Sequence, residues 1–136
     1  MGFHHEIPVR YGEVDQQGVV FNAHYLAYVD DAMDHWMRLL DARFESMGWD
    51  YMVRHAELEW LDGARIGETL AIEAEVVRWG NTSFAVHLLL HVSGRPVFTA
   101  DMTYVGVEAG TTTPLAAPPE VRRHLGQPAG PGPEQD

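Results

Sequence analysis

The 136-residue chain contains no cysteine and no lysine. The absence of cysteine excludes disulfides, thiolate metal ligands and a cysteine nucleophile. All nine basic residues are arginine, against 20 Asp and Glu, and the formal net charge is −11. Because such a field repels polyanions and no basic run interrupts it, we expect no binding to nucleic acid. An anionic ligand would need a few local arginines or backbone N–H groups.

Long apolar runs are missing as well. No stretch approaches the ~20 residues needed to span a bilayer, and residues 1–6 lack the basic start and apolar stretch of a signal peptide. We therefore expect a cytoplasmic protein that does not insert into membranes. No serine lies in a Gly-x-Ser-x-Gly elbow, which argues against serine hydrolysis. The eight histidines show no metal-ligand spacing along the chain, so no metal site is predicted.

The composition that is present is typical of one globular domain. Hydrophobic residues make up 46% of the chain and charged residues 21%, a balance that builds a packed core and that disordered chains lack. We assign this domain to residues 1–125, with one or two helical turns expected at 118–125. The Pro- and Gly-rich residues 126–136 are predicted to form a disordered tail.

Hydrophobic periodicity indicates an α+β fold. Apolar residues recur at three- and four-residue steps from about Ala23 to Ser46, which predicts one long helix with Gly48 as its stop. A single long helix set between a first strand and a meander suggests that the sheet wraps the helix. A period of two predicts strands, the last three joined by short turns into the meander, at residues 6–11, 56–61, 69–79, 83–92 and 97–107.

Residues with catalytic potential concentrate in the loop at 10–25, which leads into the long helix. A helix start offers free N–H groups and a partial positive charge, which could stabilise the oxyanion developing on a thioester carbonyl. A nearby carboxylate, Asp15, could attack that carbonyl or deprotonate a water. Two simpler interpretations stand beside this one. Asp15 would then bond its own backbone as an Asx-turn, and Asn22 would be the N-cap of the helix.

Other charged residues have simpler interpretations. Asp101 lies in a mostly apolar strand, and a paired structural carboxylate would explain it. His87 and His91 share one strand face and are interpreted as surface residues. Glu57 and Glu59 also share one face of their predicted strand, and that face either borders the candidate site or is exposed to solvent.

The loop resembles the 4-hydroxybenzoyl-CoA thioesterase family of hotdog proteins, including its acyl-CoA thioesterase branch linked to the Tol-Pal system. The similar positions are an aromatic residue, two acidic residues, a Gly, a Val and a Tyr at the helix start, namely Tyr11, Glu13, Asp15, Gly18, Val20 and Tyr25. The resemblance continues through 56–61, 67–70 and 81–84 and covers about residues 6–125. It implies a hotdog fold, in which an antiparallel sheet wraps a long central helix.

The resemblance also implies a function, the cleavage of an aromatic, short-chain or medium-chain acyl-CoA to the free acid and CoA. Asp15 would be the catalytic carboxylate, and the N–H groups at Asn22 to His24 would form the oxyanion site. No cofactor is implied beyond the CoA that the substrate carries. Such proteins are homodimers or homotetramers, so a partner's strand around 58–61 would supply a second wall. The substrate-binding residues implied are Gly18, Val19, Phe21, Asn22, Ala23, His24, Tyr25, Tyr28, Glu59, Thr82 and Ser83.

Two departures from the family pattern keep alternatives open. The Asn and His positions of the Tol-Pal branch are exchanged here, at Asn22 and His24. Where some relatives carry Arg or Lys near the CoA nucleotide, this chain has Gly80, Asn81 and Thr82, so an acyl carrier protein could be the donor instead. The alternatives are a non-catalytic hotdog protein that binds acyl thioesters or serves an assembly, and, more weakly, an enzyme that hydrates enoyl thioesters.

Overall fold

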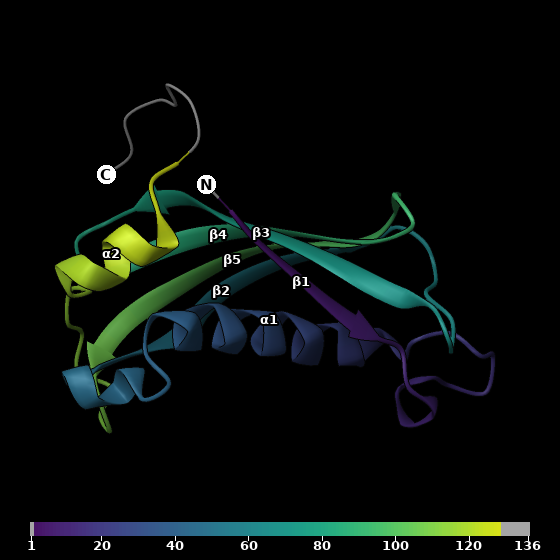
Figure 1. The fold of residues 1–136 in the computed structure, drawn as a ribbon, viewed down its shortest axis with the longest axis horizontal. Coiled ribbons are helices and arrows are strands. Elements are labelled where there is room, and N and C mark those ends of the chain that lie inside the picture. Colours follow the sequence, from purple (N-terminus) through teal and green to yellow (C-terminus); the bar gives the residue numbers. More distant parts are fainter. Residues whose placement is uncertain (1, 129–136) are drawn as a thin grey trace.

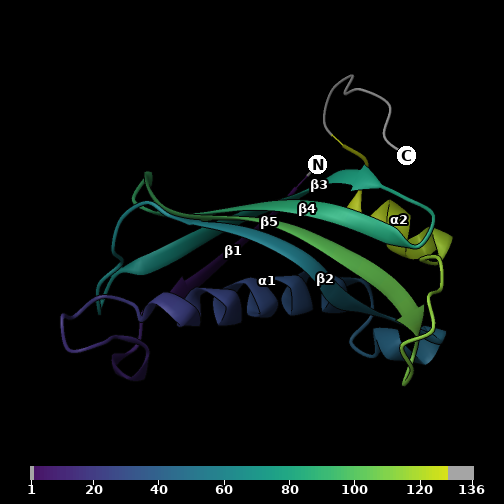
Figure 2. The ribbon, with the colours of Figure 1, turned by 180° about the vertical axis from the view of Figure 1, so that it is seen from behind.

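The computed structural model describes residues 2–128 of the chain. A five-stranded antiparallel sheet, in the order β1-β3-β4-β5-β2, curls around one long helix, α1 (Figure 1). Seen from behind, β2 runs beside α1 at one edge of the sheet (Figure 2). The elements are β1 (Phe3–Pro8), α1 (Tyr25–Leu40), β2 (Trp49–Trp60), β3 (Thr69–Trp79), β4 (Ser83–Val92), β5 (Arg95–Glu108) and α2 (Pro119–Leu125).

The core lies between the concave face of the sheet and α1. The buried stripe of α1 repeats at three- and four-residue steps, as an amphipathic helix requires, and comprises Tyr25, Tyr28, Val29, Ala32, Met33, Trp36 and Met37. Alternate residues of β3 and β4 face this stripe, among them Leu70, Ile72, Leu88 and Leu90. This arrangement confirms the expected α+β hotdog fold, with its long helix wrapped by an antiparallel sheet.

Several predicted boundaries were wrong. The long helix ends at Leu40 rather than near Ser46, because Asp41 is extended and a separate 3-10 turn follows at Phe44–Met47. Gly48, with φ of 80°, ends that turn and not α1. The remaining corrections are to strand ends: β1 covers 3–8 instead of 6–11, β2 begins at Trp49 instead of Ala56, and β5 covers 95–108 instead of 97–107.

The convex face of the sheet carries pairs of histidine and acidic side chains. Asp101 accepts a 2.7 Å bond from His87, which confirms the paired structural carboxylate. Glu73 contacts both His4 and His91, at 2.7 and 3.2 Å. This face is polar and lies away from α1.

The C-terminal residues that the structure describes pack against the domain. The helical turns expected at 118–125 are confirmed as α2, whose Val121 and Leu125 are buried. The indole N–H of Trp79 donates to the carbonyl of Gly126 at 2.9 Å, and the rest of the predicted tail, from 129 to 136, lies outside the described residues. None of the helices in the described part of the chain has the length and apolar character needed to cross a membrane.

Candidate active site

Asp15 opens a tight turn in the loop between β1 and α1. Its N–H donates to Val19 O at 2.8 Å, and its carbonyl accepts from Gly18 N–H at 2.9 Å. Gly18 has φ of 81°, a left-handed conformation that favours glycine. The carboxylate atom Oδ1 accepts from Gln17 N–H at 2.8 Å, so the Asx-turn interpretation is confirmed. The turn holds one oxygen of a half-buried Asp15, and the structure gives Oδ2 no such bond.

Glu13 anchors this loop to the helix and is the buried acidic residue of the domain core. It accepts bonds from the backbone N–H and the guanidinium of Arg10, at 2.9 and 2.8 Å, and from the Tyr28 hydroxyl at 2.8 Å. Burial alone raises the pKa of Glu13, but these bonds outweigh it and hold the pKa below its ordinary value. Burial and then the bond to Glu13 raise the pKa of Tyr28. Glu13 is therefore ionised and Tyr28 neutral, and their bond fixes the loop against α1.

The helix begins through one 3-10 turn, Asn22–His24, and not through an N-cap at Asn22 as one interpretation had it. The N-cap position of the turn is Phe21, with no side-chain cap bond. The first bond of the turn runs from His24 N–H to Phe21 O at 2.8 Å. Among residues 2–128, the N–H groups of Asn22 and Ala23 therefore have no backbone or side-chain acceptor. These two N–H groups lie at the positive end of the helix dipole and are free to bind an oxyanion.

Trp60, at the end of β2, holds this turn in place. Its indole N–H donates to Asn22 O at 3.1 Å, and its ring meets Phe98 edge-on, 5.4 Å between centroids. The carbonyl of Asn22 and the N–H of Ala23 belong to one planar trans peptide, in which they point in opposite directions. The bond to the carbonyl therefore orients the Ala23 N–H as a donor.

A largely apolar cavity of about 260 Å³ opens at this point. It is lined by Asn22, Ala23, Leu26, Leu58, Trp60 and Phe98. Aromatic and aliphatic walls with a few backbone donors are the usual make-up of a small-molecule site. Leu58 and Trp60 of the same chain form one wall, so that wall does not depend on a partner subunit.

The structure places the other predicted site residues in different surroundings. Tyr25 and Tyr28 belong to the core, and Phe21 is half-exposed beside the turn. Gly18 and Val19 lie in the Asp15 turn, where Val19 bridges to Arg65. Glu59 is exposed and lines a hollow on the convex face. Asp15, His24 and these residues do not line the 260 Å³ cavity within one protomer.

Thr82 and Ser83 lie at the far end of the sheet from the cavity. Ser83 pairs with Val105 near the end of β5, whereas Phe98, at the cavity, pairs with Trp60 near its beginning. Val105 lies seven residue steps beyond Phe98 along β5, a distance of about 23 Å. These two residues reach an acyl site only if a second copy brings them there.

A second hollow of about 300 Å³ lies further along α1 on the same side and was missed from the sequence. Asp30, Asp34, Tyr51 and Tyr104 are among its lining residues. Burial raises the pKa of Asp30. Asp30 is exposed and lines this hollow from the side of α1.

An antiparallel sheet wrapped around a helix, with an open cavity at the helix start, is the architecture of hotdog proteins. The chain matches the Thioesterase-like superfamily over residues 9–125 and belongs to that family. It is 24% identical to the acyl-CoA thioesterase YbgC of Haemophilus influenzae over 125 residues, which are 89% of this chain and 92% of the relative.

Two further similarities agree with this assignment. The 1,4-dihydroxy-2-naphthoyl-CoA hydrolase of Synechococcus elongatus is 27% identical over 108 residues, 76% of this chain and 79% of the relative. The solved structure of SAV2348 from Staphylococcus aureus, in complex with CoA, superposes with a TM-score of 0.84 at 15% identity, over 98% of this chain and 90% of that one. At that identity the superposition shows the shared fold.

Proposed function

We propose that this chain hydrolyses acyl-CoA thioesters, with Asp15 as the catalytic carboxylate and the Asn22 and Ala23 N–H groups as the oxyanion site. The observation that supports the proposal most strongly is the cavity at the helix start, which is lined by Asn22 and Ala23, the two residues whose N–H groups have no acceptor among residues 2–128. Relatives named as acyl-CoA thioesterase and hydrolase agree with this activity.

The proposed chemistry combines the donors of the helix start with the carboxylate of Asp15, which does not line the cavity within one protomer. Backbone donors aimed at the position of the developing oxyanion stabilise the tetrahedral transition state more than the ground state. Asp15, on the short turn that leads into the same helix start, either attacks the carbonyl or takes a proton from the attacking water. In both routes one water is consumed, the carbon–sulfur bond breaks, and the products are a carboxylic acid and a thiol.

We propose an aromatic acyl group or one of short to medium length. The cavity walls include the aromatic rings of Trp60 and Phe98, and a volume of about 260 Å³ accommodates a small acyl group but not a long chain. The 1,4-dihydroxy-2-naphthoyl-CoA hydrolase, whose name gives an aromatic substrate, is among the similar proteins. An aromatic acyl group also agrees with membership of the 4-hydroxybenzoyl-CoA thioesterase branch, which we propose for this chain.

Coenzyme A is the proposed donor, in preference to an acyl carrier protein. The turn at Gly80 and Asn81 has no basic residue of its own, but Arg122 from α2 donates to the carbonyls of both, at 2.9 and 3.4 Å. The guanidinium also lies over the ring of Trp79, 4.7 Å from its centroid. α2 thereby brings a positive charge to the turn where some relatives carry Arg or Lys.

A homodimer joined along β2 is the proposed assembly. β2 is 12 residues long and pairs on one side with β5. Its other side is an open edge flanked by half-exposed apolar side chains, including Met52, Val53 and Trp60. A long open edge of this kind is a template for pairing with another chain. Pairing between two copies would also place each cavity beside the partner subunit.

The test is the substitution Asp15→Asn, assayed for thiol release over aromatic, branched and straight-chain acyl-CoAs. Asparagine keeps an oxygen that can accept the Gln17 N–H, so the turn and the fold should be preserved. The expected result is unchanged thermal stability with turnover reduced at least about a thousandfold, as for loss of a reacting group.

The matched control is Asp41→Asn. Asp41 accepts the N–H of Arg43 at 2.9 Å in the same i to i+2 geometry, at an exposed position after α1. It should leave turnover unchanged. Equal turnover in Asp15→Asn would remove the mechanism, and saturable binding of acyl-CoA with no product from the wild type would favour the non-catalytic binding protein. Transfer of ¹⁸O from labelled water into Asp15 in a single turnover would identify direct attack.

A further inference from the structure

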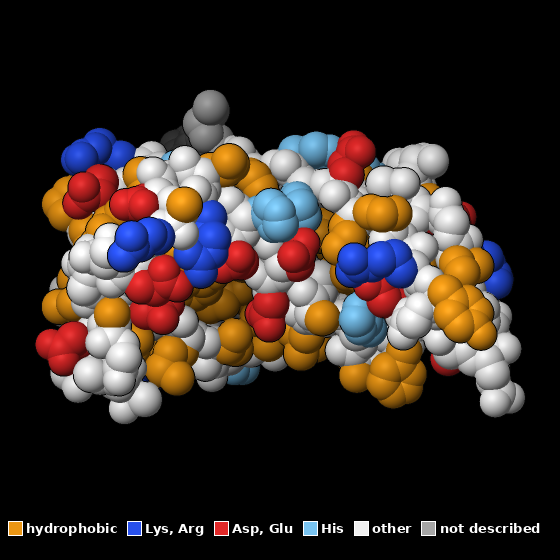
Figure 3. Space-filling model, turned by 60° about the horizontal axis from the view of Figure 1, so that its bottom comes forward, with side chains coloured by type: hydrophobic (Ala, Val, Ile, Leu, Met, Phe, Trp, Pro, Cys, Tyr) orange, Lys and Arg blue, Asp and Glu red, His pale blue; other side chains and the backbone are white. Residues whose placement is uncertain are grey.

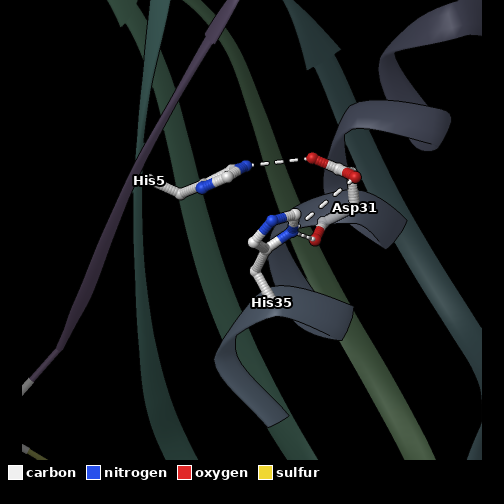
Figure 4. Close-up of side chains that lie close together, drawn as sticks. All are labelled: His5, Asp31 and His35. Carbon is white, nitrogen blue, oxygen red and sulfur yellow. Dashed lines mark hydrogen bonds and ion pairs between the residues drawn. The ribbon is translucent and has the colours of Figure 1, made fainter. Parts of the chain in front are cut away.

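Two histidines and an aspartate converge on the side of α1 that faces β1. His5 comes from β1, and Asp31 and His35 come from consecutive turns of α1 (Figure 4). His5 Nε2 lies 2.9 Å from Asp31 Oδ2, and His35 Nδ1 lies 3.7 Å from Asp31 Oδ1. One ligand-type atom from each residue lies within 4.8 Å of the other two. Sequence spacing did not suggest the group, because 26 residues separate His5 from Asp31.

The geometry is close to that of a three-ligand metal site. Around a tetrahedral zinc ion with bonds of ~2.0–2.1 Å, neighbouring ligand atoms are about 3.3 Å apart, so the three atoms would draw together and His35 Nδ1 would exchange its 3.1 Å contact with the Asp31 carbonyl for the ion. The i, i+4 spacing of Asp31 and His35 places both on one helix face. The two imidazole rings already approach to 4.4 Å between centroids.

The surroundings favour a cation. The face of the molecule that exposes α1 shows acidic and histidine side chains over the middle of the helix (Figure 3). His5 is mostly buried, with 16% of its side chain exposed, whereas Asp31 and His35 are 39% and 57% exposed. One ligand is thus held by the fold, and the other two leave a path from solvent.

We propose that His5, Asp31 and His35 bind a divalent transition-metal ion, zinc first among them. Two imidazole nitrogens and one carboxylate suit Zn²⁺ or Co²⁺, whereas Mg²⁺ and Ca²⁺ prefer oxygen ligands throughout. Three protein ligands leave a fourth position for water or a small anion. The ion would join β1, an edge strand, to α1.

This site is separate from the acyl cavity. Asp31 lies six residues beyond the start of α1 at Tyr25, about 9 Å along the helix axis. The cavity involves the side of α1 that meets Leu58 and Trp60 of β2, whereas His5 belongs to β1 at the opposite edge. Zinc binding and thioester hydrolysis can therefore be tested independently of each other.

The test uses the full-length chain without an affinity tag, freed of metal with a chelator and titrated with ZnCl₂ by calorimetry. The wild type should bind one equivalent per chain. Asp31→Asn keeps the shape and the bond to His5 but removes the charged ligand, and His35→Ala changes an exposed residue. Because loss of a supporting partner alone weakens metal binding by roughly 10–100-fold, each variant should bind at least about tenfold more weakly.

The control is His4→Ala, the neighbouring residue on β1. Its side chain lies on the convex face, against Glu73 and Glu6, and the variant should bind zinc as the wild type does. Titration with CoCl₂ gives a second readout, the intense visible bands of four-coordinate cobalt, which His35→Ala should lose. Absence of stoichiometric binding, wild-type affinity in Asp31→Asn and His35→Ala, or equal loss in His4→Ala would each overturn the proposal.

Discussion

The two edges of the sheet differ in length, in composition and in what lies beside them. β1 has six residues, carries His4 and Glu6 on its convex side, and ends at Pro8. β2 has 12 residues and carries exposed Met52 and Val53. Short, charged, proline-ended strands resist pairing with other chains, whereas long apolar ones invite it. We therefore expect the β1 edge to resist pairing with a second copy of the chain and the open β2 edge to favour it.

The same helix lies between the two edges and faces each with different chemistry. On the β2 side, Leu26 of α1 and Leu58 of β2 share an apolar cavity. On the β1 side, Asp31 of α1 bonds His5 of β1. One amphipathic helix thus lines an apolar cavity on its β2 side and a polar cluster on its β1 side, and we expect substitutions to affect one without the other.

Among substitutions that separate the two edges, the largest effect is expected from a charge on the open edge of β2. Val53 is 52% exposed on β2 and lines the hollow that contains Asp30 and Asp34. In Val53→Glu, a fifth acidic residue joins the four that line this hollow, and a partner subunit would bring the same five. Since an unpaired charge buried at an interface costs several kcal/mol, the dimer dissociation constant should rise at least about a hundredfold. Analytical ultracentrifugation over a range of concentrations measures it.

Leu39→Glu is the control for this change. Leu39 is 69% exposed near the end of α1, so the same charge is added to the surface away from either edge. It should leave the mass unchanged. A wild type that sediments as a monomer of 15.3 kDa, or a Val53→Glu variant that remains dimeric, would contradict pairing along β2.

The second prediction concerns the loop that links β1 to the start of α1. Glu13→Gln removes the charge that binds Arg10 and Tyr28, and it should destabilise the fold by about 1–3 kcal/mol at pH 7. The pKa of Glu13 is lowered in the folded state from an ordinary value of 4.5. Its stabilising contribution is therefore present above about pH 4.5 and is lost as the pH falls through the folded-state pKa.

Urea unfolding of the wild type and Glu13→Gln at pH 7 and at pH 3 measures this contribution. The difference between the two proteins should shrink at the acid pH, because the wild type loses the charge of Glu13 as the pH falls through its folded-state pKa. A difference that stays constant with pH would mean that packing, and not charge, accounts for the role of Glu13.

The sequence predicted most of the fold and the region of the site. The strands at 69–79 and 83–92 were predicted with their observed ends, because strict alternation and the Gly80-Asn81 turn agree there. The start of β2 was missed, since residues 49–55 do not alternate cleanly and pairing with β5 decides their structure. The alternation of apolar and polar residues was sufficient to predict a strand and its ends where one face of that strand is buried along its whole length.

The site was predictable only where its residues are close in sequence. Asp15 and Asn22 were identified within one loop, because loop and helix start are continuous. The role of Trp60 was not identified, because its bond to Asn22 joins residues that are 38 positions apart in the sequence. The cluster at His5 is likewise a product of tertiary structure. The start of a helix and the residues of a turn can be predicted from neighbouring positions in the sequence. The wall of a cavity and the residues that surround a metal ion depend on which edge strand lies beside α1.

The smallest effect is expected from Trp60→Phe. Phenylalanine keeps an aromatic ring against Phe98 but removes the indole N–H that bonds Asn22 O. Losing one hydrogen bond is worth about 0.5–1.5 kcal/mol, so turnover should fall roughly 3–10-fold as the Ala23 N–H loses its orientation. Trp49→Phe removes a similar indole bond, to Leu115 O at the other end of β2, and should leave turnover unchanged. If the two variants lost turnover equally, the bond to Asn22 would be structural, and the oxyanion donors would have to be sought elsewhere.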